Sequence, residues 1–184
     1  RQAILAFDGD VYQGLDVGSF NQRDFTHAQK VLRILSGLYG VLRPLDLMMP
    51  YRLEMGTKLK NPRGANLYAF WGGLIADELN KAMVDSPGRK ALINLASIEY
   101  FKSVDTSVLE SPIITPAFLD AKGAAEPKTI AFFAKRARGS MAAWIIQNRV
   151  KSPSEIEGFD GLGYAFSAER STEDRPVFVR RNPA

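Results

Sequence analysis

The chain has 184 residues and a formal net charge of +4, and 46% of its residues are hydrophobic, which suffices for one substantial core. It contains no cysteine, so disulfides, thiolate metal clusters and a peroxide-reducing thiol are excluded. Its single histidine, His27, argues against an imidazole-rich metal site, and no apolar run reaches membrane-spanning length. These features predict one soluble, cytoplasmic domain over residues 1–184, monomeric by default, with no bound metal and no cofactor.

The first part of the chain is predicted to hold two short strands and one helix. The strands are Ala3–Phe7 and Val11–Tyr12, separated by a tight turn. Apolar residues recur at helical spacing from Arg23 to Ser36, where Thr26 and Gln29 fit a capping box.

The middle of the chain is predicted to contain the strongest helix and a buried strand. Periodic apolar residues place the helix at Asn66–Met83, and its Gly72–Gly73 pair indicates close packing against another element. The apolar run Ala91–Leu95 is typical of a central strand.

The last part of the chain alternates between strands and helices without a regular period. Its predicted elements are the strands Ile113–Phe118 and Thr129–Ala134, the helix Arg138–Val150, a helix start at Ser152–Glu155, and a hairpin of Gly163–Ala168 with Pro176–Arg180. This order favours an α+β fold with one mixed sheet.

Positive charge is concentrated in two windows. Residues 23–63 hold eight basic and three acidic residues, and residues 122–151 hold seven basic residues against Glu126 alone. The local charges are therefore +5 and +6, so the remainder of the chain is acidic overall. This segregation predicts a basic surface or cleft that attracts anions.

The sharpest basic cluster comprises Lys135, Arg136 and Arg138, followed by Gly139. Between a predicted strand and a predicted helix, free helix amides would face the same space as the three cations, which is an arrangement that binds phosphate. A solvated basic turn explains the cluster equally well.

A second candidate is the segment that carries Gly37, Gly40 and Arg43. In one interpretation, Gly37 ends a helix, Gly40 makes a tight turn and Pro44 prevents the helix from continuing. In the other, the segment is a helix-hairpin-helix whose bare glycine amides contact a duplex phosphate. The spacing of three between the glycines matches that hairpin signature only approximately.

A third candidate is the polar end of the predicted central strand. Asn94, Ser97, Glu99, Tyr100 and Lys102 follow the apolar run, as expected for the rim of a cleft. Arg52 would supply part of the facing wall. The alternative is purely local, with Ser97 as a helix cap and Glu99 paired with Lys102.

Four segments in fixed order closely resemble the peroxide stress protein YaaA family of bacteria. They are Leu35–Asp46, Pro50–Gly56, Asn94–Lys102 and Ala134–Met141, and the resemblance runs from Arg1 to about Arg180. The family's N-terminal segment, with its Ser-Pro-Ala-Lys motif, has no counterpart. Because the chain also opens without methionine inside a predicted strand, we expect that a preceding segment has been removed.

The resemblance implies a cytoplasmic protein that acts during hydrogen peroxide stress and lowers intracellular free iron. It also implies a curved, partly barrel-like sheet wrapped by helices, a positively charged cleft, a helix-hairpin-helix element and duplex DNA binding. It implies no defined reaction.

Two functional hypotheses follow. In the first, Gly37, Gly40 and Arg43 act with Lys135, Arg136, Arg138 and Gly139 on the backbone of duplex DNA without reading sequence. In the second, a small phosphorylated or nucleotide-like anion binds in the cleft. Arg52 and Lys135 would hold that anion, Glu99 would act as general base, and Tyr100 and Lys102 would assist as candidate catalytic residues.

Overall fold

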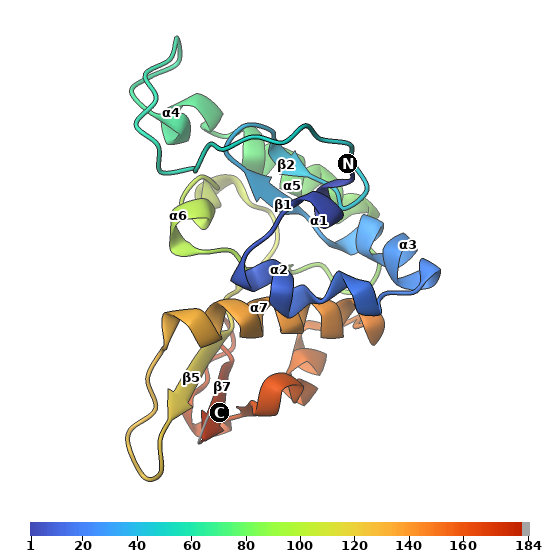
Figure 1. Cartoon of the computed structure of the whole chain (residues 1–184), viewed down its shortest axis with the longest axis vertical. Coiled ribbons are helices and arrows are strands. Elements are labelled where there is room, and N and C mark those ends of the chain that lie inside the picture. The colour runs from blue at the N-terminus through green and yellow to red at the C-terminus, as the bar shows by residue number, and fades with distance from the viewer. Residues whose placement is uncertain (182–184) are drawn as a thin grey trace.

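The computed structural model describes residues 1–181, which form helices, most of them short, and three small sheets (Figure 1). The α-helices are α1 (Ala3–Ala6), α2 (Asp10–Leu15), α3 (Gln22–Val31), α4 (Leu67–Trp71), α5 (Leu74–Asp85), α6 (Ile98–Phe101) and α7 (Ala131–Gln147). The strands are β1 (Ile34–Ser36), β2 (Gly40–Leu42), β3 (Leu92–Ile93), β4 (Ile113–Ile114), β5 (Ala117–Ala121), β6 (Ala165–Phe166) and β7 (Val177–Arg181). Short 3₁₀ turns are η1 (Val17–Ser19), η2 (Thr106–Val108), η3 (Pro153–Gly158), η4 (Gly161–Gly163) and η5 (Ala168–Arg170). Strands β5 and β7 lie at one edge of the molecule beside α7 (Figure 1).

The α+β class is confirmed, but the single curved, partly barrel-like sheet was wrong. Within residues 1–181, β1 and β2 form an antiparallel pair, β3 and β4 a parallel pair, and β5, β7 and β6 a three-stranded sheet in that order. The strands have two to five residues each. The closing hairpin is confirmed as the antiparallel pair β6–β7.

The predicted N-terminal strands were wrong, because both segments are helical. In α1, the amides of Ala3 and Ile4 donate to the carbonyls of Asp46 and Pro44, while both side chains are buried. In a segment of six or fewer residues, the apolar pattern is too short to distinguish the two-residue period of a strand from the period of a helix. Packing against the rest of the protein therefore decides the conformation.

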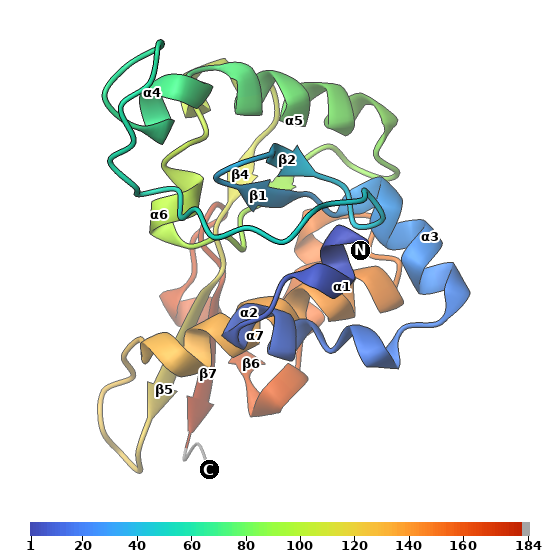
Figure 2. The ribbon, with the colours of Figure 1, turned by 45° about the horizontal axis from the view of Figure 1, so that its top comes forward.

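Helix α7 is the longest element, and it begins at Ala131, seven residues before the predicted start. The predicted strand Thr129–Ala134 was therefore wrong. Both ribbon views show α2 lying along α7 (Figures 1 and 2). The two helices meet at glycines: a Cβ on Gly14 would lie 2.1 Å from the Arg136 carbonyl oxygen, and one on Gly139 would lie 1.8 Å from that of Val11.

The predicted helix Asn66–Met83 is divided in two. Gly72 has φ = +48°, a conformation that ends α4, and α5 begins again at Leu74. Asn66 caps α4 by accepting a hydrogen bond from the Ala69 amide at 2.9 Å. The predicted helix start at Ser152 is confirmed as a capping box with Glu155, although the turns that follow are 3₁₀ rather than α.

Helix α3 begins and ends earlier than predicted. Its capping box is formed by Asn21 and Asp24, not by Thr26 and Gln29, and it ends at Val31 so that β1 can begin at Ile34. The Gln29 side chain instead accepts a hydrogen bond from the Leu45 amide at 2.9 Å.

Three clusters of buried apolar side chains form the core. The first lies among α1, α3, the β1–β2 hairpin and the end of α7: Ala3, Ile4, Leu15, Phe20, Ala28, Ile34, Leu42, Met48, Ala143 and Ile146. The second joins the start of α7 to the three-stranded sheet: Ile114, Phe118, Ala134, Ala137, Met141, Ile156, Phe159, Tyr164 and Phe178. The third lies under α4 and α5: Met55, Leu67, Ile75, Ala76, Leu79 and Val104. Among the described residues, no helix has the length and apolarity to cross a lipid bilayer.

Candidate functional site

The glycine-bearing segment is a β-hairpin, which corrects the helix-hairpin-helix prediction. Ser36 pairs with Gly40 across the turn, and strands rather than helices flank both glycines. A Cβ on Gly40 would lie 2.8 Å from the Trp71 ring, and one on Gly37 would lie 2.4 Å from the Leu53 carbonyl oxygen. Both glycines therefore allow close packing, and the Gly37 carbonyl accepts a hydrogen bond from Trp71 Nε1 at 3.1 Å.

Arg43 and Arg52 do not lie at the predicted cleft. Arg43 donates through Nε to Asp46 Oδ1 at 3.0 Å, and its Nη2 lies 2.9 Å from the same oxygen. Hydrogen bonding to Asp46 raises the pKa of Arg43, so the guanidinium stays protonated, and the Asp46 carboxylate balances its charge. Arg52 is exposed, and neither arginine lines the cavity of about 830 Å³ described below.

The basic cluster lies inside α7 rather than before it. Because the helix starts at Ala131, the amides of Lys135, Arg136 and Arg138 are within the helix and are not free to bind phosphate. Lys135 Nζ lies 3.8 Å from Asp10 Oδ2 on α2. Arg136 points elsewhere, with its guanidinium 5.8 Å from the centre of the Phe132 ring. Gly139 is buried beneath α2.

A cavity of about 830 Å³ lies among α2, β3, α6 and α7. Most of its wall is apolar, and one face of α7 contributes residues at helical spacing: Lys135, Arg138, Gly139, Ala142, Ile145 and Ile146. Polar groups gather on the side where β3 ends: Asn94, Ser97, Glu99 and Tyr100. The structure thus brings together two of the predicted cations and most of the predicted polar rim.

Arg138 is a half-buried charge of this wall that has no carboxylate partner within residues 1–181. Its side chain is half-buried, Nη1 donates to the Ala96 carbonyl at 2.8 Å, and Nε donates to the Ala134 carbonyl at 3.3 Å. Burial lowers its pKa, and no carboxylate within residues 1–181 forms an ion pair with it. An arginine held in this way can offer its remaining donors to an anion in the cavity.

The predicted catalytic candidates lie on helix α6 or at its end, and their side chains contact different groups. Ser97 caps this helix by accepting from the Tyr100 amide at 3.3 Å. Glu99 Oε1 accepts a hydrogen bond from the Gly56 amide at 2.8 Å. The Glu99 carboxylate therefore holds the loop around Gly56 and is not oriented to take a proton from a substrate. Burial raises the pKa of Tyr100, which lines the cavity. Lys102 lies over the Tyr68 ring, 5.1 Å from its centre, and does not line the cavity.

The sequence interpretation missed Asp10 and Tyr12 as wall residues, because it placed Asp10 in a turn and Tyr12 in a strand. Val11 and Leu15, spaced four apart, were the signal of a helix that presents both to this space. Burial raises the pKa of Tyr12 well above its ordinary value, so its phenol stays protonated. Within the described residues, no three histidine, aspartate or glutamate side chains gather closely enough to hold a metal ion.

One known protein family matches most of the chain. Residues 1–170 match the family model described as peroxide stress protein YaaA. The chain belongs to this family. The match covers the glycine hairpin, the polar end of β3 and the whole of α7, so the elements that build the cavity lie within the region that resembles other YaaA proteins. Membership relates the protein to the peroxide stress response.

Proposed function

We propose that this member of the peroxide stress family acts by binding a small organic anion in the cavity beside α7. The single observation that carries the proposal is Arg138, a half-buried guanidinium on the cavity wall that has no carboxylate partner in residues 1–181. Uncompensated buried charge is costly, and an anionic ligand offsets that cost.

The wall also indicates the class of ligand. Lys135 lies on the same helical face as Arg138, three residues earlier, so both cations can approach one phosphate or carboxylate group. Asn94 and Ser97 offer polar contacts at the same end, and the apolar remainder of the cavity suits a base or ring system. A phosphorylated or nucleotide-like molecule fits this distribution. Lower free iron during peroxide stress would then be an indirect consequence of ligand binding.

The test compares two arginines on one helix. Thermal-shift and calorimetric titrations with nucleoside mono- and diphosphates are expected to identify a stabilising ligand for the unmodified chain. Arg138→Gln is expected to weaken its binding at least about tenfold, because charge-assisted hydrogen bonds are lost. Arg136→Gln, which removes the same charge from a side chain outside the cavity, is the matched control. Equal losses in both variants, or no stabilisation by any anion, would contradict the proposal.

Non-sequence-specific binding of duplex DNA is the second candidate function. It is favoured by exposed cations outside the cavity, Arg52 and Arg136, which form no ion pair within residues 1–181. Fluorescence anisotropy with a labelled duplex at several salt concentrations tests it. Arg136→Gln is expected to reduce the slope of log affinity against log salt by about one. An unchanged slope would remove Arg136 from the DNA contact.

A further inference from the structure

A second, smaller hollow of about 270 Å³ lies between α3 and the end of α7. It is lined by Gln22, Arg23, Thr26, His27, Lys30 and Arg149. Three of these side chains are basic, one is the only histidine of the chain, and none is acidic.

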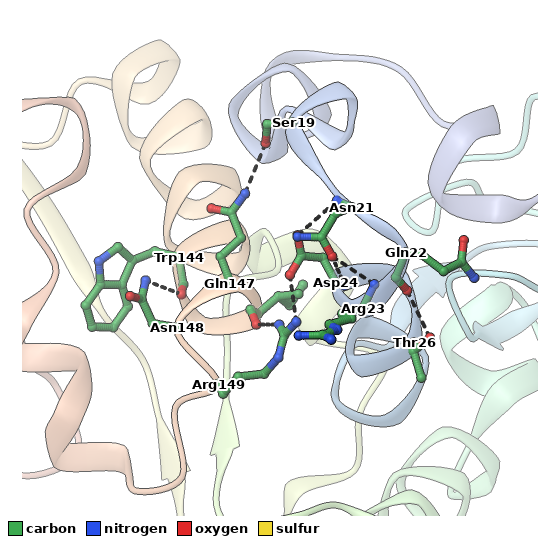
Figure 3. A network of polar contacts seen from close by, with 11 residues as sticks. Ser19, Asn21, Gln22, Arg23, Asp24, Thr26, Trp144, Gln147, Asn148 and Arg149 are labelled. Atoms are coloured by element: carbon green, nitrogen blue, oxygen red, sulfur yellow. Dashed lines mark hydrogen bonds and ion pairs between the residues drawn. The ribbon is translucent and has the colours of Figure 1, made fainter.

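Arg149 is held in an unusual backbone conformation at this hollow. It follows the C-terminal cap of α7 with φ = +54°, a left-handed position that glycine or asparagine usually occupies. Its Nη2 donates to Asp24 Oδ1 at 2.8 Å, and its Nη1 donates to the Ile146 carbonyl (Figure 3). The conformation and both contacts fix the guanidinium beside α3.

The charges of this region do not balance. Asp24 is the carboxylate that pairs with Arg149, and both of its oxygens already accept a hydrogen bond. Oδ1 accepts from Arg149, and Oδ2 accepts from the Asn21 amide at 3.0 Å. Arg23 and Lys30 form no ion pair within residues 1–181. Asp24 therefore balances Arg149 and leaves the other two permanent cations of the hollow without a carboxylate partner in the described residues.

His27 lacks a hydrogen-bond partner at its inner nitrogen. Nε2 is buried and unpaired within the described part of the chain. Burial, together with the charges of Arg149 and Lys30, lowers the pKa of His27, while the nearby Asp24 opposes this effect. An oxyanion beside Nε2 would accept a hydrogen bond from the imidazolium and would reverse the repulsion by the two cations.

We propose that this hollow binds a tetrahedral oxyanion, such as sulfate or the phosphate group of a small molecule, through Arg23, Lys30 and Arg149, with His27 as a further donor when protonated. Helix amides are not part of the site, because the Arg23 and Asp24 amides donate to the Asn21 side chain (Figure 3). Arg149 and its partner Asp24 join the site to α7. Lys30 also lines the larger cavity, so the two hollows adjoin at α3, whereas Arg138 lines only the larger one.

The single histidine makes the test direct. The imidazole signals of His27 are followed by NMR from pH 4 to 9 in sulfate and in chloride at equal ionic strength. Sulfate keeps its charge over this range, so any pH dependence belongs to the protein. Binding is expected to raise the His27 pKa by about one unit, which corresponds to a tenfold preference of sulfate for the imidazolium form. Affinity should accordingly increase as the pH falls.

Two double variants separate a site from general screening. Arg23→Gln with Lys30→Gln is expected to abolish the sulfate-specific shift, and both positions are exposed on α3, so the fold is retained. Lys58→Gln with Lys60→Gln removes the same charge from an exposed loop and should keep the shift. Equal shifts in both variants would overturn the proposal, as would the absence of any difference between sulfate and chloride. A shift produced by a DNA duplex but not by sulfate would also overturn it.

Discussion

Asp120 shows how one buried charge joins segments that are distant in sequence. Its side chain is fully buried, accepts from Tyr164 Oη at 2.8 Å and from Arg180 Nε at 2.7 Å, and thereby ties β5 to the chain around η4 and to β7. The Arg180 guanidinium also lies over the rings of Phe133 and Tyr164. Burial raises the pKa of Tyr164 far above neutrality, so the phenol remains a donor.

We expect Asp120→Ala to lower the free energy of unfolding by about 3–5 kcal/mol, because it leaves Arg180 buried without its partner. Tyr164→Phe removes only one hydrogen bond and should cost about 1–2 kcal/mol. Urea unfolding followed by circular dichroism measures both. A cost for Tyr164→Phe equal to that of Asp120→Ala would contradict the dominance of the ion pair.

Gly139 tests the contact between α2 and α7 at the level of one atom. Gly139→Ala places a Cβ against the backbone of Val11 and Leu15, which cannot rotate away, and is expected to cost at least about 2 kcal/mol. Gly73→Ala is the control, since a Cβ added there would have no neighbour within 4 Å and the residue has φ = −80°. This control should change stability by less than about 1 kcal/mol. Thermal unfolding of both variants gives the comparison.

At the scale of the element, α3 is anchored at its first turn by a carboxylate that also binds α7. The Asn21 amide and the Arg149 guanidinium lower the pKa of Asp24, against the opposing effect of desolvation. A folded pKa below the unfolded value near 3.9 means that this contribution is complete above about pH 5 and is lost as the pH falls through the folded pKa.

Asp24→Asn is therefore expected to destabilise the protein at neutral pH and to make less difference as the pH approaches 2. The measurement is the free energy of unfolding of both proteins between pH 2 and 7. Asn21→Ala, which removes the cap acceptor but not the carboxylate, should cost about 1 kcal/mol above pH 5. A pH-independent effect of Asp24→Asn would contradict the assignment of the lowered pKa.

At the scale of the whole molecule, two elements connect the three apolar clusters. Helix α7 contributes Ala137 and Met141 to the second cluster and Ile146 to the first. The β1–β2 hairpin contributes Ile34 to the first cluster and Leu35 to the third. Shared elements of this kind predict that the clusters unfold together, as one domain does.

The two tryptophans report on different clusters and allow this prediction to be measured. Trp71 packs on the third cluster and Trp144 on the second. In Trp71→Phe and Trp144→Phe variants, the remaining fluorescence signal and the far-UV circular dichroism are expected to change at the same urea concentration. Separate transitions for the two signals within either variant would show that the clusters belong to independently folding units.

The sequence by itself determined the chemical limits, the mixed α+β class, the closing hairpin, the helical nature of residues 138–147 and the family. These depend on composition, on long periodic segments and on motifs in fixed order, none of which needs a distant contact. It also assigned Lys135, Asn94 and Tyr100 to one cleft, and these three residues line the same cavity.

Tertiary structure alone decided what the short segments are and where each cation points. The glycine segment is a hairpin because Trp71 and the Leu53 backbone pack on it, and residues 10–15 are helical because α2 packs against α7 at Gly14 and Gly139. Starting α7 at Ala131 sets the helical phase that turns Lys135 and Arg138 toward the cavity and Arg136 away from it. Local propensity is too weak over four to six residues to determine such choices, so long-range packing makes them.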